Sequence, residues 1–304
     1  MNRREFAQGM AAAAGLGAGL SAAGLGTARA EEPSAGGKGR APFPLSVMLC
    51  TISPSLPFED RLAKVADAGY RNVELVGEYA HWNDADYARA KIAKRQLGVE
   101  FDATAGLGHG VADAAARDAF LADLTAALTP METLECPAMI VLSGNVVQGQ
   151  TREAQHAAAV ETLKRAAAVV EKREIRGEKV RLLLECIDPK ENPNYFLTRA
   201  TEAIEIVRAV DHPQVQFLYD IFHEQIAEGN LMEKLNEHID VIGLVHVADV
   251  PGRHQPGTGE INYGNIFRRL AELKYQRMVA MEFRALGDEA AALRGARQLA
   301  ESAG

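Results

Sequence analysis

Residues 180–187 read VRLLLECI, and three later stretches repeat the pattern: VQFLYDI (215–221), VIGLVHV (241–247) and MVAMEF (278–283). Each is a short apolar run with one polar residue near its end. Runs of this length and composition are typical of strands buried on both faces, as in a parallel sheet. The four stretches therefore predict four buried strands that each present one polar side chain.

The same alternation continues upstream through the rest of the chain. Four further apolar runs lie at 45–52, 72–76, 99–104 and 138–143. Amphipathic stretches predict helices at 58–68, 86–96, 114–128, 152–173, 198–210, 231–237, 266–274 and 288–301. Strands that alternate with helices in this number predict a (β/α)8 TIM barrel, which would form a single α/β domain over residues 43–304.

An open, doubly wound sheet is the alternative fold. Such sheets normally carry a glycine-rich turn after the first strand. Here the first run ends in CTISP (50–54), which contains no glycine. The sequence therefore favours the barrel.

Charge and cysteine content exclude some classes of function. The chain has 304 residues, 33 Lys and Arg, 41 Asp and Glu and a formal net charge of -8. An acidic chain without a basic cluster is a poor ligand for nucleic acid. Three cysteines cannot build a disulfide framework.

The N-terminus has the pattern of an export signal. Arg3 and Arg4 precede a Gly/Ala-rich apolar run, which ends at Ala28-Arg29-Ala30. This pattern predicts a twin-arginine (Tat) signal peptide over residues 1–30, followed by a linker over 31–42. We expect a periplasmic or secreted protein, with membrane anchoring through an uncleaved signal as the alternative.

The four polar strand residues are Glu185, Asp220, His246 and Glu282. Active-site groups of a TIM barrel lie at the C-terminal ends of the strands, so these side chains are expected to converge. Three buried carboxylates need a cation or shared protons, and the mixed O/N set suits Mn²⁺, Mg²⁺ or Co²⁺. The alternative is four unrelated residues, each paired with a basic side chain at the barrel mouth.

Two longer segments resemble the hydroxypyruvate isomerase family, which belongs to the xylose isomerase-like TIM barrels. They are YDIFHEQIAEGNL (219–231) and HVADVPGRHQPGTGEINYGNIF (246–267). The resemblance implies a metal-dependent isomerase that interconverts hydroxypyruvate and tartronate semialdehyde. It also implies that Glu185 and Glu282 are the catalytic acid/base pair and metal ligands, with Asp220 and His246 completing the metal shell.

The mechanism expected from this resemblance passes through a cis-enediolate. One glutamate would remove a proton beside the carbonyl, and the other would return a proton to the neighbouring carbon. The resemblance also implies substrate contacts from His223, Arg253, His254, Glu191 and His109. Arg253 could hold a substrate carboxylate with two parallel hydrogen bonds.

Other readings stay open at this point. His246 stands where hydroxypyruvate isomerases often have Gln and ketose 3-epimerases have His, so His246 and Glu191 favour an epimerase. An endonuclease IV-type barrel needs more histidine ligands than the 8 His of this chain offer near strand ends. A non-catalytic exported metal- or sugar-binding barrel would keep the same residues.

Expected partners are a small-molecule substrate and the Tat machinery, with a homo-oligomer as an alternative to the monomer.

Overall fold

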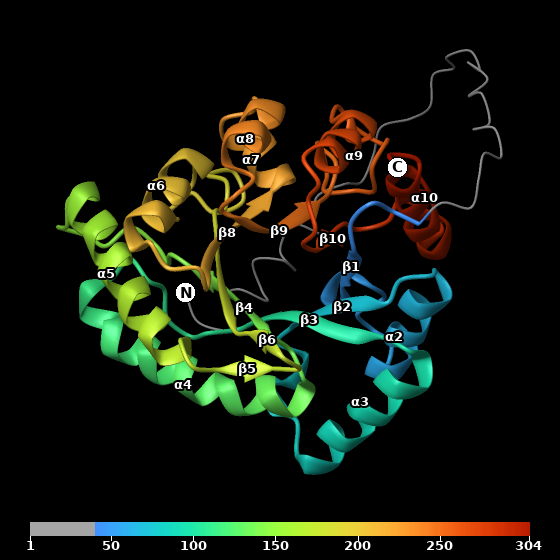
Figure 1. Ribbon diagram of the computed structural model, residues 1–304, viewed down its shortest axis with the longest axis horizontal. Coiled ribbons are helices and arrows are strands. Elements are labelled where there is room, and N and C mark those ends of the chain that lie inside the picture. Colours follow the sequence, from blue (N-terminus) through green and yellow to red (C-terminus); the bar gives the residue numbers. More distant parts are fainter. Residues whose placement is uncertain (1–39) are drawn as a thin grey trace, which may run out of the picture.

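The computed structural model describes residues 40–304, and their main feature is a closed barrel of parallel strands (Figure 1). The strands run β1-β10-β9-β8-β7-β4-β3-β2 around the barrel. Their bounds are β1 Leu45–Met48, β2 Asn72–Val76, β3 Glu100–Ala105, β4 Ala138–Leu142, β7 Arg181–Glu185, β8 Val215–Asp220, β9 Ile242–Val247 and β10 Val279–Met281. The predicted TIM barrel is confirmed.

Helices cover the outside of the barrel, as Figure 1 shows for α4, α5 and α6 on one side and α2 and α3 on another. Their bounds are α2 Phe58–Asp67, α3 Asp84–Leu97, α4 Arg117–Leu134, α5 Arg152–Val170, α6 Ala200–Val210, α7 Ile221–Ala227, α8 Leu231–His238, α9 Tyr263–Glu272 and α10 Glu289–Glu301. Several begin at side-chain caps. Thr151 accepts a hydrogen bond from the N–H of Ala154, and Asn83 and Asp86 form a capping box.

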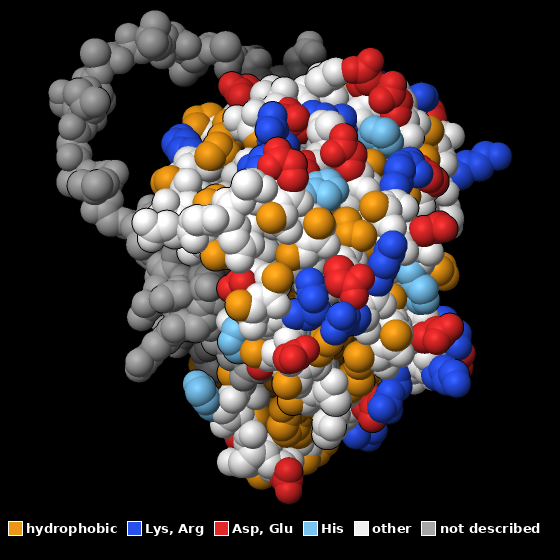
Figure 2. Space-filling model, turned by 90° about the vertical axis from the view of Figure 1, so that its left-hand side faces the viewer, with side chains coloured by type: hydrophobic (Ala, Val, Ile, Leu, Met, Phe, Trp, Pro, Cys, Tyr) orange, Lys and Arg blue, Asp and Glu red, His pale blue; other side chains and the backbone are white. Residues whose placement is uncertain are grey.

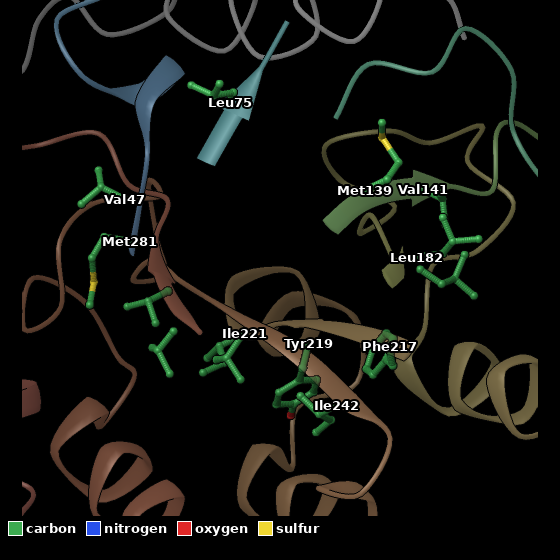
Figure 3. Packing of buried hydrophobic residues seen from close by; sticks show 14 of the residues in the cluster. Val47, Leu75, Met139, Val141, Leu182, Phe217, Tyr219, Ile221, Ile242 and Met281 are labelled. Carbon is green, nitrogen blue, oxygen red and sulfur yellow. The ribbon is translucent and has the colours of Figure 1, made fainter. Parts of the chain in front are cut away.

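Side chains alternate between two hydrophobic layers. Leu183, Leu218 and Leu244 point into the barrel, in a cluster with small residues such as Ala103 and Ala280. Their neighbours along each strand point outward into the layer under the helices, where Figure 3 shows Phe217, Tyr219 and Ile242 together. The period-2 alternation of a strand accounts for this arrangement, since in β7 the residues Leu182 and Leu184 face the helices while Glu185 faces inward.

Three local features differ from the sequence expectation. Two-residue strands β5 (Glu174–Ile175) and β6 (Glu178–Lys179) form a hairpin before β7, so α5 ends earlier than the predicted residue 173. Gly177 has φ 78° in this turn, which a glycine adopts without strain. Helix α7 was not predicted. Helix α4 extends to Leu134 through Pro130.

The predicted signal peptide and most of the predicted linker lie outside the described residues. Among residues 40–304, no helix combines the length and the hydropathy that crossing a membrane requires. On the face shown in Figure 2, acidic and basic side chains are interspersed rather than segregated. Cys50, Cys136 and Cys186 are all free thiols.

Gly243 in β9 has no room for a side chain inside the barrel. A Cβ there would lie 2.5 Å from Gln216 Oε1 and 2.7 Å from Leu183 Cδ2. We predict that Gly243→Ala lowers the free energy of unfolding by roughly 1–3 kcal/mol through overpacking. Gly295 lies inside α10 with no atom within 4 Å of its added Cβ. Gly295→Ala should instead stabilise by roughly 0.5–1 kcal/mol. Urea unfolding of both variants measures the difference, and equal effects would contradict the packing argument.

Candidate metal centre and active site

Four side chains converge at the C-terminal end of the barrel. Glu185 and Asp220 are the last residues of β7 and β8, His246 lies near the end of β9, and Glu282 directly follows β10. One ligand atom from each of the four lies within 4.8 Å of the others, and all four residues are buried. The structure therefore brings together the whole set expected from the strand ends.

Asp220 divides its two carboxylate oxygens between structure and site. Its Oδ1 accepts hydrogen bonds from the backbone N–H groups of Phe222 and His223. These bonds cap the N-terminus of helix α7. Its Oδ2 faces the cluster, 3.2 Å from Arg253 Nη2. Because the cap fixes one oxygen, the other is held in place for a ligand.

The imidazole of His246 lies between carboxylates. Its Nδ1 is 2.7 Å from Glu282 Oε2 and 3.7 Å from Glu185 Oε1, and its Nε2 is 3.1 Å from Glu74 Oε2. None of these close pairs has hydrogen-bond geometry, so both ring nitrogens and Glu282 Oε2 lack a hydrogen-bond partner among the described residues. Buried polar atoms without partners are rare and indicate a missing ion or water.

The electrostatics of the cluster favour an added positive charge. Burial raises the pKa of Glu185, and the nearby carboxylates of Glu282 and Asp220 raise it further, against the opposing effect of His246. Burial lowers the pKa of His246, but the carboxylates of Glu74 and Glu282 outweigh burial and hold it well above its usual value. A mixed set of carboxylate oxygens and one imidazole nitrogen fits a hard or borderline divalent cation.

Arg253 enters this site from the loop after β9. Its Nη2 contacts Glu282 as well as Asp220, and its Nη1 lies 3.0 Å from Glu191 Oε2 and 3.1 Å from His223 Nε2. Burial raises the pKa of Glu282, but Arg253 and then His246 reverse this and lower it to about 2. Arg253 thus supplies a fixed positive charge beside the expected metal position.

His223 and Asp188 form a second buried pair next to Arg253. His223 Nδ1 lies 2.6 Å from Asp188 Oδ2, and these two residues group with Glu191 as a second ligand-like set. Burial lowers the pKa of His223, but Asp220 and Asp188 outweigh it and raise the value to about 9 despite the opposing Arg253. His223 therefore lies between the Asp188 carboxylate at Nδ1 and the Arg253 guanidinium at Nε2.

A buried aspartate that the sequence analysis did not single out organises the Arg253 loop. Asp249 accepts hydrogen bonds from the backbone N–H groups of Val250, Gly257, Gly259 and Ile261. Four amides on one carboxylate fold the segment 249–261 back on itself. This holds Arg253 at φ 58°, with its guanidinium turned into the barrel mouth.

Two of the residues implied as substrate contacts lie away from the cluster. His109 is 45% exposed at its side chain and pairs with Asp123 of α4, where Nδ1 and Oδ2 are 2.8 Å apart. His254 directs Nδ1 to the carbonyl oxygen of Arg284, 2.7 Å away. The structure thus places Arg253, His223 and Glu191 at the site, and His109 and His254 in contacts that support loops.

Sequence reasoning overlooked two carboxylates inside the barrel. Glu74 of β2 and Asp102 of β3 are both buried, and Asp102 accepts a 2.6 Å hydrogen bond from Ser46. Their signal was present, because NVELV (72–76) and VEFDAT (99–104) each contain an acidic residue within a buried strand. It is the same signal that identified the four strand-end residues.

Comparison with known proteins agrees with this geometry. The family profile of the xylose isomerase-like TIM barrel matches residues 62–302. The chain belongs to this family. A 2-oxo-tetronate isomerase of Pectobacterium atrosepticum is 30% identical over 79% of this chain and 91% of its own length. The hydroxypyruvate isomerase of Escherichia coli is 30% identical over 79% and 92%. Like these two relatives, the present chain is an isomerase.

Solved structures show the same barrel. A family 2 AP endonuclease of Brucella melitensis superposes with a TM-score of 0.73 at 25% identity, covering 84% of this chain and 96% of its own. D-psicose 3-epimerase of Clostridium cellulolyticum H10 superposes with a TM-score of 0.68 at 20% identity, covering 86% and 96%. The likeness to the epimerase establishes the fold alone.

We predict that Mn²⁺ or Co²⁺ stabilises the purified protein. Metal bound only to the folded state at a hundredfold excess over its Kd contributes about 2.7 kcal/mol. The unfolding midpoint should therefore rise with metal and fall back with EDTA. Asp220→Asn should reduce the rise, whereas Glu178→Gln, in the exposed hairpin strand β6, should retain it. A midpoint that does not respond to metal would argue against a metal centre.

Proposed function

We propose that the chain is a metal-dependent isomerase of a small hydroxy-carbonyl acid, of the hydroxypyruvate and tartronate semialdehyde type. The order of strands supports this proposal. Glu185 on β7 and Glu282 after β10 flank Asp220 on β8 and His246 on β9. A substrate seated over the two central residues would therefore have one carboxylate on either side.

The two glutamates would share the proton transfers. One accepts the proton from the carbon beside the carbonyl, which produces a cis-enediolate. The hydroxyl proton passes to the former carbonyl oxygen, and the other glutamate donates a proton to the former carbonyl carbon. The reverse reaction exchanges their roles. A positioned acid or base contributes roughly 10²–10⁴-fold to such a step.

A divalent metal, with Mn²⁺, Mg²⁺ and Co²⁺ as candidates, would be held by Glu185, Asp220, His246 and Glu282. When bound, it polarises the substrate carbonyl and offsets the negative charge that develops on the substrate oxygens. The unpartnered buried atoms of His246 and Glu282 support this assignment.

Arg253 supports an acid rather than a neutral sugar as the substrate. Its guanidinium is buried beside the cluster and packs over the Phe222 ring, 4.9 Å from the ring centroid. A planar guanidinium matches a carboxylate with two parallel hydrogen bonds. Hydroxypyruvate and 2-oxo-tetronate, named for the relatives above, are both 2-oxo acids.

A ketose 3-epimerase is the second candidate. Glu191 lies at the rim of the site, 3.0 Å from Arg253, where it could contact hydroxyl groups of a longer substrate. His246 favours the same reading. A non-catalytic binding barrel would keep the metal and substrate contacts without turnover. The endonuclease reading has less support, because the four-residue cluster contains a single histidine.

Glu185→Gln and Glu282→Gln should each reduce turnover of hydroxypyruvate at least a hundredfold with the fold intact, because each removes a proton-transfer group. The measurement is proton exchange from D₂O into product by NMR, at metal concentrations that saturate each variant. Asp220→Asn separates the two roles, since excess metal should recover much of its activity. Retained exchange in either glutamine variant would remove that glutamate from the acid/base pair.

Arg253→Ala should lower kcat/KM for hydroxypyruvate about ten- to a hundredfold, mainly through KM, because a charged hydrogen bond contributes about 1.5–3 kcal/mol. A neutral ketose should lose much less. Arg208→Ala is a matched control, since this exposed arginine pairs with Asp240 on the surface. Equal losses for acid and ketose would contradict carboxylate recognition, and faster turnover of the ketose in the unmodified enzyme would favour the epimerase.

A further inference from the structure

We propose that Glu74 is a positioning residue that fixes the tautomer and the orientation of His246 for metal binding through Nδ1. The inference rests on the proposed metal-dependent function and deepens it. It concerns a residue on β2, on the far side of the ring from the four-residue cluster.

The geometry assigns a separate task to each nitrogen of His246. Nδ1 points to Glu282 Oε2 at 2.7 Å and to Glu185 Oε1 at 3.7 Å, both members of the cluster. Nε2 points the opposite way, to Glu74 Oε2 at 3.1 Å. Only Nδ1 therefore faces the space between the expected ligands.

An imidazole binds a metal through the nitrogen that carries no proton. With a metal at Nδ1, the single N–H of the neutral ring would lie at Nε2, where the negative charge of the Glu74 carboxylate 3.1 Å away favours it. The same contact would disfavour a turned ring, because turning it would point a carbon atom instead of Nε2 at Glu74. Carboxylate partners of this kind also raise the basicity of a metal-bound histidine.

No other role for Glu74 is visible in the described part of the chain. Its side chain is fully buried, and the one ion pair that it makes there is with His246. The nearby carboxylate of Asp102 instead bonds to Ser46. Because a buried carboxylate without a compensating charge is strongly unfavourable, the imidazole of His246 is the group that compensates Glu74 in the described structure.

The pairing of β2 with β3 is irregular next to Glu74. Val73 faces Phe101 and Glu74 faces Ala103, so the register shifts by one residue and Asp102 is the extra residue of a bulge. The bulge sets the small side chain of Ala103 opposite Glu74. Bulges beside active sites commonly redirect side chains in this way.

Two substitutions separate the acceptor from the volume of the side chain. Glu74→Leu removes the acceptor at similar size, whereas Glu74→Gln keeps an oxygen that can accept the Nε2 proton. Asp102→Asn is the matched control, because it alters a buried carboxylate of the same barrel interior that bonds to Ser46. The measurement is Mn²⁺ affinity of the full chain by calorimetry, with folding checked by circular dichroism.

Glu74→Leu should weaken Mn²⁺ binding about 10- to 100-fold. Glu74→Gln should recover most of that loss, and Asp102→Asn should leave affinity unchanged. Unchanged affinity in a folded Glu74→Leu protein would overturn the inference about Glu74. A loss as large in Asp102→Asn would also overturn it, since the effect would then belong to the barrel interior in general. No Mn²⁺ binding by the unmodified protein would instead contradict the proposed function.

A second readout needs no substitution and applies even where Glu74→Leu fails to fold. In ¹⁵N-histidine-labelled protein loaded with diamagnetic Mg²⁺, NMR should show His246 protonated at Nε2 and unprotonated at Nδ1. A proton at Nδ1, or the metal at Nε2, would overturn the proposal.

Discussion

Three carboxylates buried at one end of the barrel have to share a small volume, and much of the surrounding structure compensates their charge. Glu185, Asp220 and Glu282 come from three different strands, so the barrel itself forces them together. Buried carboxylates whose oxygens lie within 4.8 Å of one another are unfavourable unless a cation or protons lie between them. Negative charge of this kind raises the pKa of His246. It also stabilises the buried guanidinium of Arg253, which pairs with Asp220 and Glu282.

The site divides into a rigid part and a part held by its own loop. The cluster stands on strand ends, where alternation and register fix the direction of each side chain. Arg253 instead depends on a loop that Asp249 closes through four backbone amides. The residues of the proposed metal site therefore belong to the barrel, whereas Arg253, the proposed contact for a substrate group, belongs to a segment that can vary without altering the barrel.

The barrel and its central cluster could be predicted because their signals are local. One polar residue near the end of each apolar run identified Glu185, Asp220, His246 and Glu282, because active-site groups of a TIM barrel lie at the C-terminal ends of the strands. The role of Glu74 could not be predicted from local signals, since nothing in the sequence of β2 reveals that its carboxylate contacts the imidazole of His246 on β9. The sequence also could not reveal the contacts of the loop histidines His109 and His254. Their partners, Asp123 and the carbonyl oxygen of Arg284, are brought to them by tertiary packing alone.

The position of Arg253 links the two parts of the site. Its Nη2 contacts Asp220 and Glu282, and the same two residues belong to the set that would hold a divalent metal. A guanidinium and a metal are attracted to the same negative charge, so a metal between these residues would weaken the attraction of Asp220 and Glu282 for Arg253. The contacts of Arg253 with Glu191 and His223 do not involve the cluster and keep its guanidinium at the barrel mouth, where a substrate carboxylate would enter.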